Sequence, residues 1–309
     1  MRPSASIIFF TVTAGAGYGL FMAAVAAFHL SARLSPRAQL ISCAVALVLV
    51  TAGLCSSTLH LANPKNARLA LSRVKTSWLS REGVLALAFF PAALLYLLAA
   101  WLSDGESGVV LRLLGILCVV LAVATVLATG MIYACLRTIR QWRTPLTPLN
   151  YLLLALMQGA LLAGCIQTLC TPGVAITTVP IIFLLALGFL GKLAYYLVIG
   201  PSAGPSINTA TRFERASVKL LDVGHTAGNF LTHEFGFQLE PRSALALRIV
   251  ALALACWVPA LLIIPAGPKD TSIWVVAAGA SYAGVLIERW LFFAEGRHVV
   301  NLFHGAQRT

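Results

Sequence analysis

A histidine and a glutamate enclose a basic segment between two apolar stretches of this chain. His60 ends the first stretch and Glu82 begins the second, and several Lys and Arg residues lie within the segment HLANPKNARLALSRVKTSWLSRE that joins them. An imidazole titrates near neutral pH, and a partly buried carboxylate can accept or release a proton, so the two side chains are suited to acid–base chemistry. Their position at the edge of apolar spans predicts a site where a small redox molecule and a soluble partner meet the membrane.

The segment between these two residues predicts its own local structure. Asn63 is a good helix N-cap and Pro64 suits a first helical position, so we expect a short interfacial helix over 65–74. Its leucines would face the membrane, and its Lys and Arg side chains would face water or lipid phosphate. The next helix is expected to begin at about Ser80, which places Glu82 in its first turn near the positive end of the helix dipole. The loop would then fold back and bring its two ends together.

The elements that must position this segment are membrane spans. With 59% hydrophobic residues, 10% charged residues and a mean hydropathy of +0.88, the 309-residue chain does not have the composition of a soluble domain. The apolar run near the amino terminus is long enough to span a bilayer, and we interpret it as a retained helix, not a signal peptide. We predict a single all-α integral membrane domain over residues 1–309, a bundle of eight transmembrane helices. The helices are expected near 7–29, 39–62, 83–102, 110–134, 149–170, 175–199, 245–264 and 273–294, with a loop over 201–242.

The distribution of charge predicts how the bundle is oriented. Lys and Arg residues are concentrated in the loops that share a side with both termini, whereas the loops on the other side carry few and include acidic Asp104 and Glu106. By the positive-inside rule, both termini and the segment 60–82 are predicted to face the cytoplasm, as in a multi-pass protein of a bacterial inner (plasma) membrane. The same rule accounts for the net charge of +12, so we expect membrane lipid and not nucleic acid as a partner.

Further ionisable side chains lie inside the predicted spans, where charge is costly and function is the default explanation. Lys192 is either part of a site or a side chain that extends to the interface. Arg248 is expected to anchor a helix end. Glu288 and Arg289 point about 100° apart on one helix, so each is expected to pair with another helix. All four lie on the side predicted to be cytoplasmic, and this one-sided pattern favours a cavity open to the cytoplasm over a transport path.

The histidines and cysteines do not predict a metal centre. His29 and His60 are expected at opposite ends of the first two helices, and the other histidines fall in the long loop and the tail. No pair therefore lies at the matching depth that axial haem ligands need. None of the 7 cysteines belongs to a CxxC motif or to the ligand run of an iron–sulfur protein. We expect no haem and no iron–sulfur cluster on this chain.

The loop over 201–242 is too long for a simple connection between helices. It contains the stretch TRFERASVKLLDVGH, which is mixed in charge and partly amphipathic. Two interpretations remain open, a docking surface for a cytoplasmic partner and a solvated interfacial helix.

Residues of the segment 60–82 match a family pattern. The pattern H-L-x2-P-x2-A-x3-L-x-R-V-x2-S-x-L-S-x-E begins at His60 and ends at Glu82, and it resembles the membrane-anchor family of dimethyl sulfoxide reductase (DmsC). The eight-helix plan and the length agree, so the resemblance covers most of the chain. The terminal stretch GVLIERWLFFAEGRHVVNLFHG is similar to the SoeC-like branch, the anchors of cytoplasmic sulfite-oxidising (sulfite dehydrogenase, quinone) complexes. Where the family commonly has a glutamate after the glycine of this helix, this chain has Val285, with Glu288 nearby.

The resemblance implies a function and a set of site residues. Anchors of this family bind no metal. They hold a molybdopterin catalytic subunit and an iron–sulfur electron-transfer subunit at the membrane, and they exchange electrons between quinone and that iron–sulfur subunit. A His and a Glu at the positions of His60 and Glu82 are implicated at the quinone site, as hydrogen-bond partner and proton-exchange group. Arg73, Lys192 and Tyr133 are further quinone-site candidates.

Topology separates the branches of this family. In reductases of this kind the loop from His to Glu lies in the periplasm, whereas the charge of this chain predicts it in the cytoplasm. That favours the sulfite-oxidising branch, with electrons running from sulfite into the quinone pool, either ubiquinone or menaquinone. The alternatives are an anchor that oxidises menaquinol for a dimethyl sulfoxide reductase in anaerobic respiration, a structural anchor without a quinone site, and a small-solute transporter.

Overall fold

A computed structural model describes residues 1–31, 34–58, 69, 71–173, 177–200, 204–213, 215–223, 228–266 and 270–309. Within these ranges 8 helices are long and apolar enough to cross a membrane, which confirms the all-α bundle predicted from hydropathy. The spans are α1 (Ala5–Ser31), α2 (Pro36–Thr58), α4 (Trp78–Leu102), α5 (Val109–Ala134), α6 (Leu146–Cys170), α7 (Thr178–Ile199), the combined α10 and α11 (Pro241–Ile263) and α12 (Thr271–Ala294).

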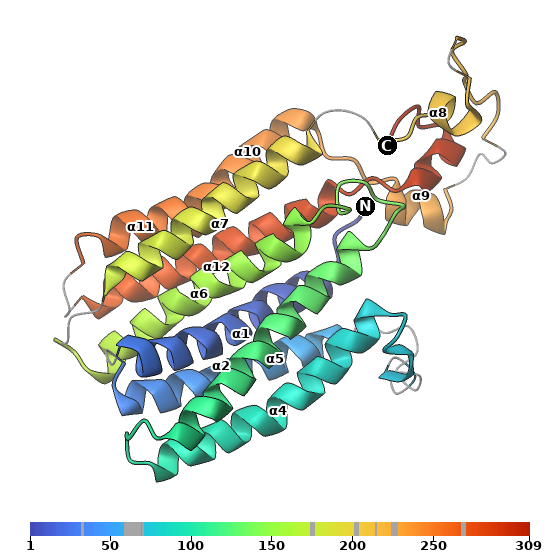
Figure 1. Ribbon diagram of the computed structural model, residues 1–309. Helices are drawn as coiled ribbons and strands as arrows, with labels where there is room; N and C mark the ends of the chain where they lie inside the picture. Colours follow the sequence, from blue (N-terminus) through green and yellow to red (C-terminus); the bar gives the residue numbers. More distant parts are fainter. Residues whose placement is uncertain are drawn as a thin grey trace.

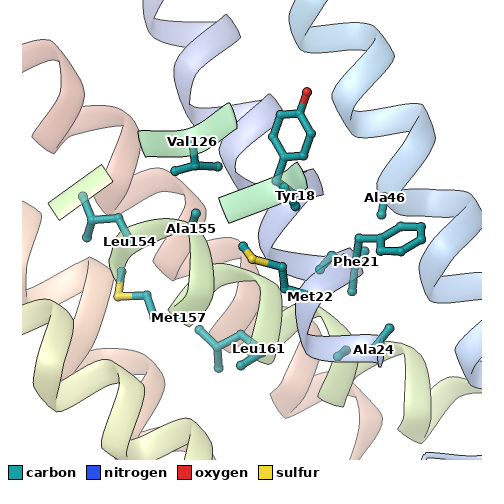
Figure 2. Close-up of a cluster of buried hydrophobic side chains, with 14 of the residues drawn as sticks. Tyr18, Phe21, Met22, Ala24, Ala46, Val126, Leu154, Ala155, Met157 and Leu161 are labelled. Carbon is teal, nitrogen blue, oxygen red and sulfur yellow. The ribbon is translucent and has the colours of Figure 1, made fainter. Parts of the chain in front are cut away.

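The spans form two halves that follow each other along the chain. The first half contains α1, α2, α4 and α5, and the second contains α6, α7, α10, α11 and α12. Figure 1 shows α2, α4 and α5 on one side of α1, and α7, α10 and α11 on the far side of α6 and α12. The two halves meet where α1 packs against α6 and α12, and where α5 packs against α6. Because α1 and α6 are covered on most sides, they are the most buried of the spans. Figure 2 shows side chains of the core between them, among them Tyr18, Phe21, Met22, Leu154, Ala155, Met157 and Leu161.

Two glycines allow α1 and α6 to approach this closely. A Cβ atom added at Gly159 would lie 1.9 Å from the backbone carbon of Gly19, and one added at Gly19 would lie 1.8 Å from the carbonyl oxygen of Ala155. Both positions therefore exclude any side chain. Small residues at a crossing permit backbone contact, which is a common source of helix association within membranes.

This crossing gives a test of the packing between the halves. Gly159→Ala is expected to lower the thermal unfolding midpoint in detergent, because overpacking of a filled core typically costs about 1–3 kcal/mol. Gly279→Ala on α12 is the matched control, since a Cβ atom there meets nothing within 4 Å. It should leave the midpoint unchanged or raise it, because alanine is the better helix former. Equal midpoints for the two variants would contradict the close α1–α6 contact.

The seventh span is not the uninterrupted helix predicted over 245–264. It consists of α10 (Pro241–Leu252), the π-helical turn η3 (Ala253–Trp257) and α11 (Val258–Ile263). Pro259 explains the interruption, because it has no N–H to donate to the carbonyl of Ala255. The Ser281 hydroxyl of α12 donates to that carbonyl instead, at 3.0 Å. A neighbouring helix thus satisfies the backbone group that proline leaves free.

Both termini lie at one end of the bundle (Figure 1), which we call the terminal face. Its described residues are 1–4, 71–77, 135–145, 204–213, 215–223, 228–240 and 295–309; the other end is called the opposite face. The long loop forms the short helices α8 (Ile207–Thr211) and α9 (Phe230–Phe235), while 215–223 is not helical. Of the two interpretations of this loop, the interfacial helix is therefore not observed over 215–223.

Contacts with the carboxyl-terminal tail hold the loop in place. Ser206 forms an isolated β-bridge with Arg308. Asn301, in the 3₁₀ turn η4 (Val299–His304), donates its side-chain amide to the carbonyl of Phe235 at 2.9 Å. The backbone N–H of Arg2 donates to the carbonyl of Glu234 at 2.8 Å. Loop, tail and amino terminus thus form one connected layer on the terminal face.

Candidate functional site

The segment before Glu82 turns the chain into α4. Residues Leu71–Arg73 form the 3₁₀ turn η2, and Ser77 is the N-cap of α4, with its side chain accepting the N–H of Ser80 at 3.3 Å. The helix therefore begins at Trp78, two residues before the predicted start near Ser80, and the prediction that Glu82 lies in its first turn is wrong. The extended backbone of Ser77 (φ −116°, ψ 124°) places the cap three residues earlier, so Glu82 lies in the second turn.

Glu82 faces the interior of the bundle. Its side chain is buried, with 5% of the residue exposed, and its Oε1 accepts a short hydrogen bond from the hydroxyl of Thr129 on α5. It lines a cavity shared by α1, α2, α4, α5 and α6, which we call the Glu82 cavity. Tyr18, Thr125 and Tyr151 also line it, and the space holds no more than about one water molecule. Thr125 and Thr129 are four residues apart, which places both on the same face of α5.

A second buried polar group lies in the other half of the bundle. The Lys192 Nζ of α7 is 2.5 Å from the Glu288 Oε1 of α12, and 2% and 3% of the two side chains are exposed. The Arg289 Nη2 lies 3.7 Å from the other oxygen of Glu288. We call these three residues the ionic cluster. Lys192 thus pairs with another helix as a buried group, and its alternative role as a side chain extending to the interface is wrong.

Aromatic side chains connect the ionic cluster to the Glu82 cavity. The guanidinium carbon of Arg289 lies 3.5 Å from the ring centre of Tyr151, a close cation–π contact. Tyr151 also lines the Glu82 cavity, so it lies between the two polar groups. Tyr133 stacks on Tyr151, with ring centres 5.8 Å apart and an interplanar angle of 26°. Tyr133 therefore packs directly on the residue that joins the two polar groups.

On its other side the ionic cluster leads to the terminal face. Tyr196 has the Lys192 ammonium and the Arg248 guanidinium over its ring, each 4.7 Å from the ring centre. Arg248 pairs with Glu295 at 2.7 Å, just beyond the end of α12, and 28% of the Arg248 side chain is exposed. Burial raises the pKa of Glu295, and the Arg248 charge opposes this shift. Glu295 is thus a carboxyl group with its pKa moved toward neutrality at the edge of the buried region.

Three of the five predicted site residues lie in this region. Tyr133 and Lys192 are connected through Tyr151 and the ionic cluster, and Glu82 shares its cavity with Tyr151. Arg73 has an exposed side chain in η2, and its backbone N–H donates to the hydroxyl of Ser80 at 3.2 Å. It does not lie beside Glu82 in the buried region. His60 lies outside the described residues, as do 65–68 and 70, half of the predicted interfacial helix over 65–74; in its described part, Leu71–Arg73 form the 3₁₀ turn η2.

Sequence reasoning missed the neutral members of this region. Tyr18, Thr129 and Tyr151 lie in long apolar spans and carry no charge that would draw attention. The four-residue spacing of Thr125 and Thr129 was one usable signal, since it places two hydroxyls on one helix face. Nothing in the sequence linked that face to Tyr18 or Tyr151, which approach from α1 and α6.

A separate polar network lies near the opposite face. The two ring nitrogens of His29 lie 2.9 Å from the Ser107 hydroxyl and 3.1 Å from the Tyr96 hydroxyl. Between this network and the Glu82 cavity, the rings of Phe21 and Phe89 are fully buried in edge contact, with centres 5.2 Å apart. Within the described ranges, no three His, Cys, Asp or Glu residues gather as a metal-binding group. The polar groups of the first half are thus divided by an apolar layer.

The described ranges thus contain eight apolar spans with a buried polar region between them, the architecture of a multi-pass membrane protein. The family described as "DMSO reductase anchor subunit (DmsC)" matches residues 1–296, so the chain belongs to this family and is a multi-pass membrane protein. It is also similar to a sulfite dehydrogenase subunit of Allochromatium vinosum. The two sequences are 34% identical over an alignment of 322 positions. The alignment covers 98% of this chain and 99% of the relative.

Proposed function

We propose that this chain anchors a molybdopterin oxidoreductase complex and carries its quinone site, where electrons pass between an iron–sulfur partner subunit and the quinone pool. The observation that carries the proposal is the buried Glu82, which lies close to the terminal face and is surrounded by hydroxyl groups. A buried carboxylate in a membrane span is costly, which makes a functional role the default, and proton exchange is the role we propose for Glu82. Membership of an anchor family supplies the context.

In this proposal the quinone headgroup would bind at the mouth of the Glu82 cavity. The cavity itself is too small for a six-membered ring. Leu54 lines it near the end of α2, from which the chain continues to His60. Glu82 and His60 would then address the two headgroup oxygens, and the unpartnered hydroxyls of Tyr18 and Tyr151 would lie behind the carboxylate.

Reduction of a quinone to its quinol takes two electrons and two protons, and oxidation of the quinol returns them. Glu82 would exchange one proton with a headgroup oxygen, and His60 would donate a hydrogen bond to the other oxygen and exchange the second proton. The electrons would come from, or return to, the iron–sulfur subunit. This chain therefore supplies binding and proton transfer, and its partners supply the redox centres.

The sulfite-oxidising branch is favoured over the reductase branch. The similar protein is named as a subunit of a sulfite dehydrogenase. The terminal face also carries many basic residues, among them Arg137, Arg140 and Arg143. By the positive-inside rule this face would lie in the cytoplasm, together with the partner subunits and the loop layer that would bind them.

A fluorescent-protein fusion at the carboxyl terminus tests the proposal in one experiment, because many such proteins become fluorescent only when they fold in the cytoplasm. We expect a fluorescent fusion that purifies from mild detergent with a molybdenum- and iron-containing complex. That complex should reduce a quinone analogue when sulfite is added. A non-fluorescent fusion would favour the reductase branch. Purification without metal-containing subunits would contradict the anchor role, and substrate flux into vesicles containing this chain alone would favour a transporter.

A further inference from the structure

We propose that the ionic cluster and Tyr151 form a proton relay that connects the terminal face to Glu82. The inference rests on the quinone site proposed above and extends it to residues that touch no quinone. A headgroup at the mouth of the Glu82 cavity would stand between the carboxylate and water. Glu82 must then exchange its proton with water through the interior of the bundle.

The contacts provide a continuous line for this exchange. At the surface, Glu295 is held by Arg248 at 2.7 Å, and Arg248 and Lys192 flank the ring of Tyr196. The ionic cluster follows, with the Lys192–Glu288 pair at 2.5 Å. Arg289 of the cluster then stacks on Tyr151, which reaches the Glu82 cavity.

Unpartnered polar atoms mark the same line. Most of the buried side-chain polar atoms without a hydrogen-bond partner in the described ranges belong to it: the Tyr18, Tyr151 and Tyr196 hydroxyls, Glu288 Oε2, Arg289 Nε and Glu295 Oε2. Buried polar atoms in native proteins usually bond to protein groups or to ordered water, and a site rich in such atoms is where internal water binds. We infer that water molecules join these side chains into a hydrogen-bonded chain.

Each member has a role set by its chemistry. The Glu288 carboxylate and the Lys192 ammonium can accept and release protons, and a tyrosine hydroxyl can donate and accept at the same time. The guanidinium of Arg289 keeps its protons, so Arg289 is a positioning residue that orders Tyr151 and the adjacent water. For each proton that Glu82 gives to the headgroup, one proton enters at Glu295; reversal returns it to water. The relay carries no electrons.

The relay is expected to open only at the terminal face. In the first half of the bundle, the fully buried rings of Phe21 and Phe89 lie between the Glu82 cavity and the network around His29. Protons exchanged by Glu82 should therefore come from the side that carries both termini.

Tyr151→Phe tests the relay, because it keeps the ring beneath Arg289 and removes only the hydroxyl. In the purified complex we expect quinone-linked turnover to fall at least about tenfold. The solvent deuterium isotope effect on that turnover should increase, and a small weak acid such as acetate should restore part of the rate. Binding of a quinone-analogue inhibitor and turnover with an artificial dye should not change. Tyr282→Phe is the matched control, since its hydroxyl lies 2.7 Å from that of Thr13, away from the relay. It should behave as wild type.

Three outcomes would contradict the relay, and they differ in whether the proposed quinone site is also rejected. Wild-type turnover and isotope effect in Tyr151→Phe would reject the relay while leaving the quinone site standing. A loss of inhibitor affinity that matches the loss of turnover would show that Tyr151 contacts the headgroup directly. Full quinone-linked turnover in Glu82→Gln would reject the quinone site itself, and the relay with it.

Discussion

Replacing Glu82 by glutamine is expected to lower quinone-linked turnover of the assembled complex by at least about a hundredfold, the usual scale of a lost general acid or base. Glutamine has nearly the same shape and can still accept the hydrogen bond of Thr129, so the cavity should persist. What disappears is the proton that the carboxyl group exchanges. Turnover with an artificial dye, which takes electrons from the partner subunits, should stay at the wild-type level. The measurement is the ratio of the two activities in the same preparation.

A glutamate outside the site provides the control. Glu106 is exposed at the opposite face, so Glu106→Gln should leave both activities unchanged. His60→Ala should reproduce the phenotype of Glu82→Gln if both residues serve the same quinone. Wild-type quinone-linked turnover in both variants would contradict the assignment of the quinone site to these residues. If quinone-analogue inhibitors also left turnover of the wild-type complex unaffected, the chain would be a structural anchor only.

Removing Glu288 should destabilise the protein more than removing Lys192. The ionic cluster contains two cations and one anion, at 2.5 Å and 3.7 Å. Lys192→Met leaves Glu288 with Arg289, a neutral pair. Glu288→Gln leaves two buried cations without a counter-charge, and breaking a buried pair typically costs about 3–5 kcal/mol. We expect a much lower unfolding midpoint in detergent, and less assembled complex, for Glu288→Gln than for Lys192→Met.

The double variant separates pairing from packing. With Lys192→Met and Glu288→Gln combined, Arg289 remains as the single cation and keeps its contact with Tyr151. The double variant should be more stable than Glu288→Gln alone. The effects of the two substitutions on the free energy of unfolding should therefore be strongly non-additive. Additive losses would mean that the two side chains do not interact, in conflict with the observed geometry.

The spans could be predicted because hydropathy is a local property. The predicted third helix, 83–102, ends where α4 ends but omits residues 78–82 at its start, because Ser77 caps the helix earlier than expected. The seventh helix shows the limit of this reasoning. Pro259 was visible in the sequence, but the Ser281 hydroxyl that permits the π-helical turn lies on another helix.

The site was predictable only in part. Glu82 and Lys192 stood out because ionisable side chains are rare in apolar spans. Their surroundings did not, since Thr129 and Tyr151 are ordinary residues until α5 and α6 bring them to the same cavity. Arg73, by contrast, was predicted to belong to the site but does not lie in the buried region. Its charge and its place in the family pattern suggested a role in the site, yet its side chain is exposed.

Composition and the order of charged residues along the chain were sufficient to predict a membrane bundle, a basic terminal face and ionisable residues within the spans. These properties depend on one helix at a time, because the cost of a charge in lipid and the length of a span need no neighbour. The partner of each buried charge was decided only by helix packing. Lys192 and Glu288 lie 2.5 Å apart because α7 and α12 share the second half of the bundle. The same packing places Tyr151 between that pair and Glu82, and so turns separate polar residues into one region.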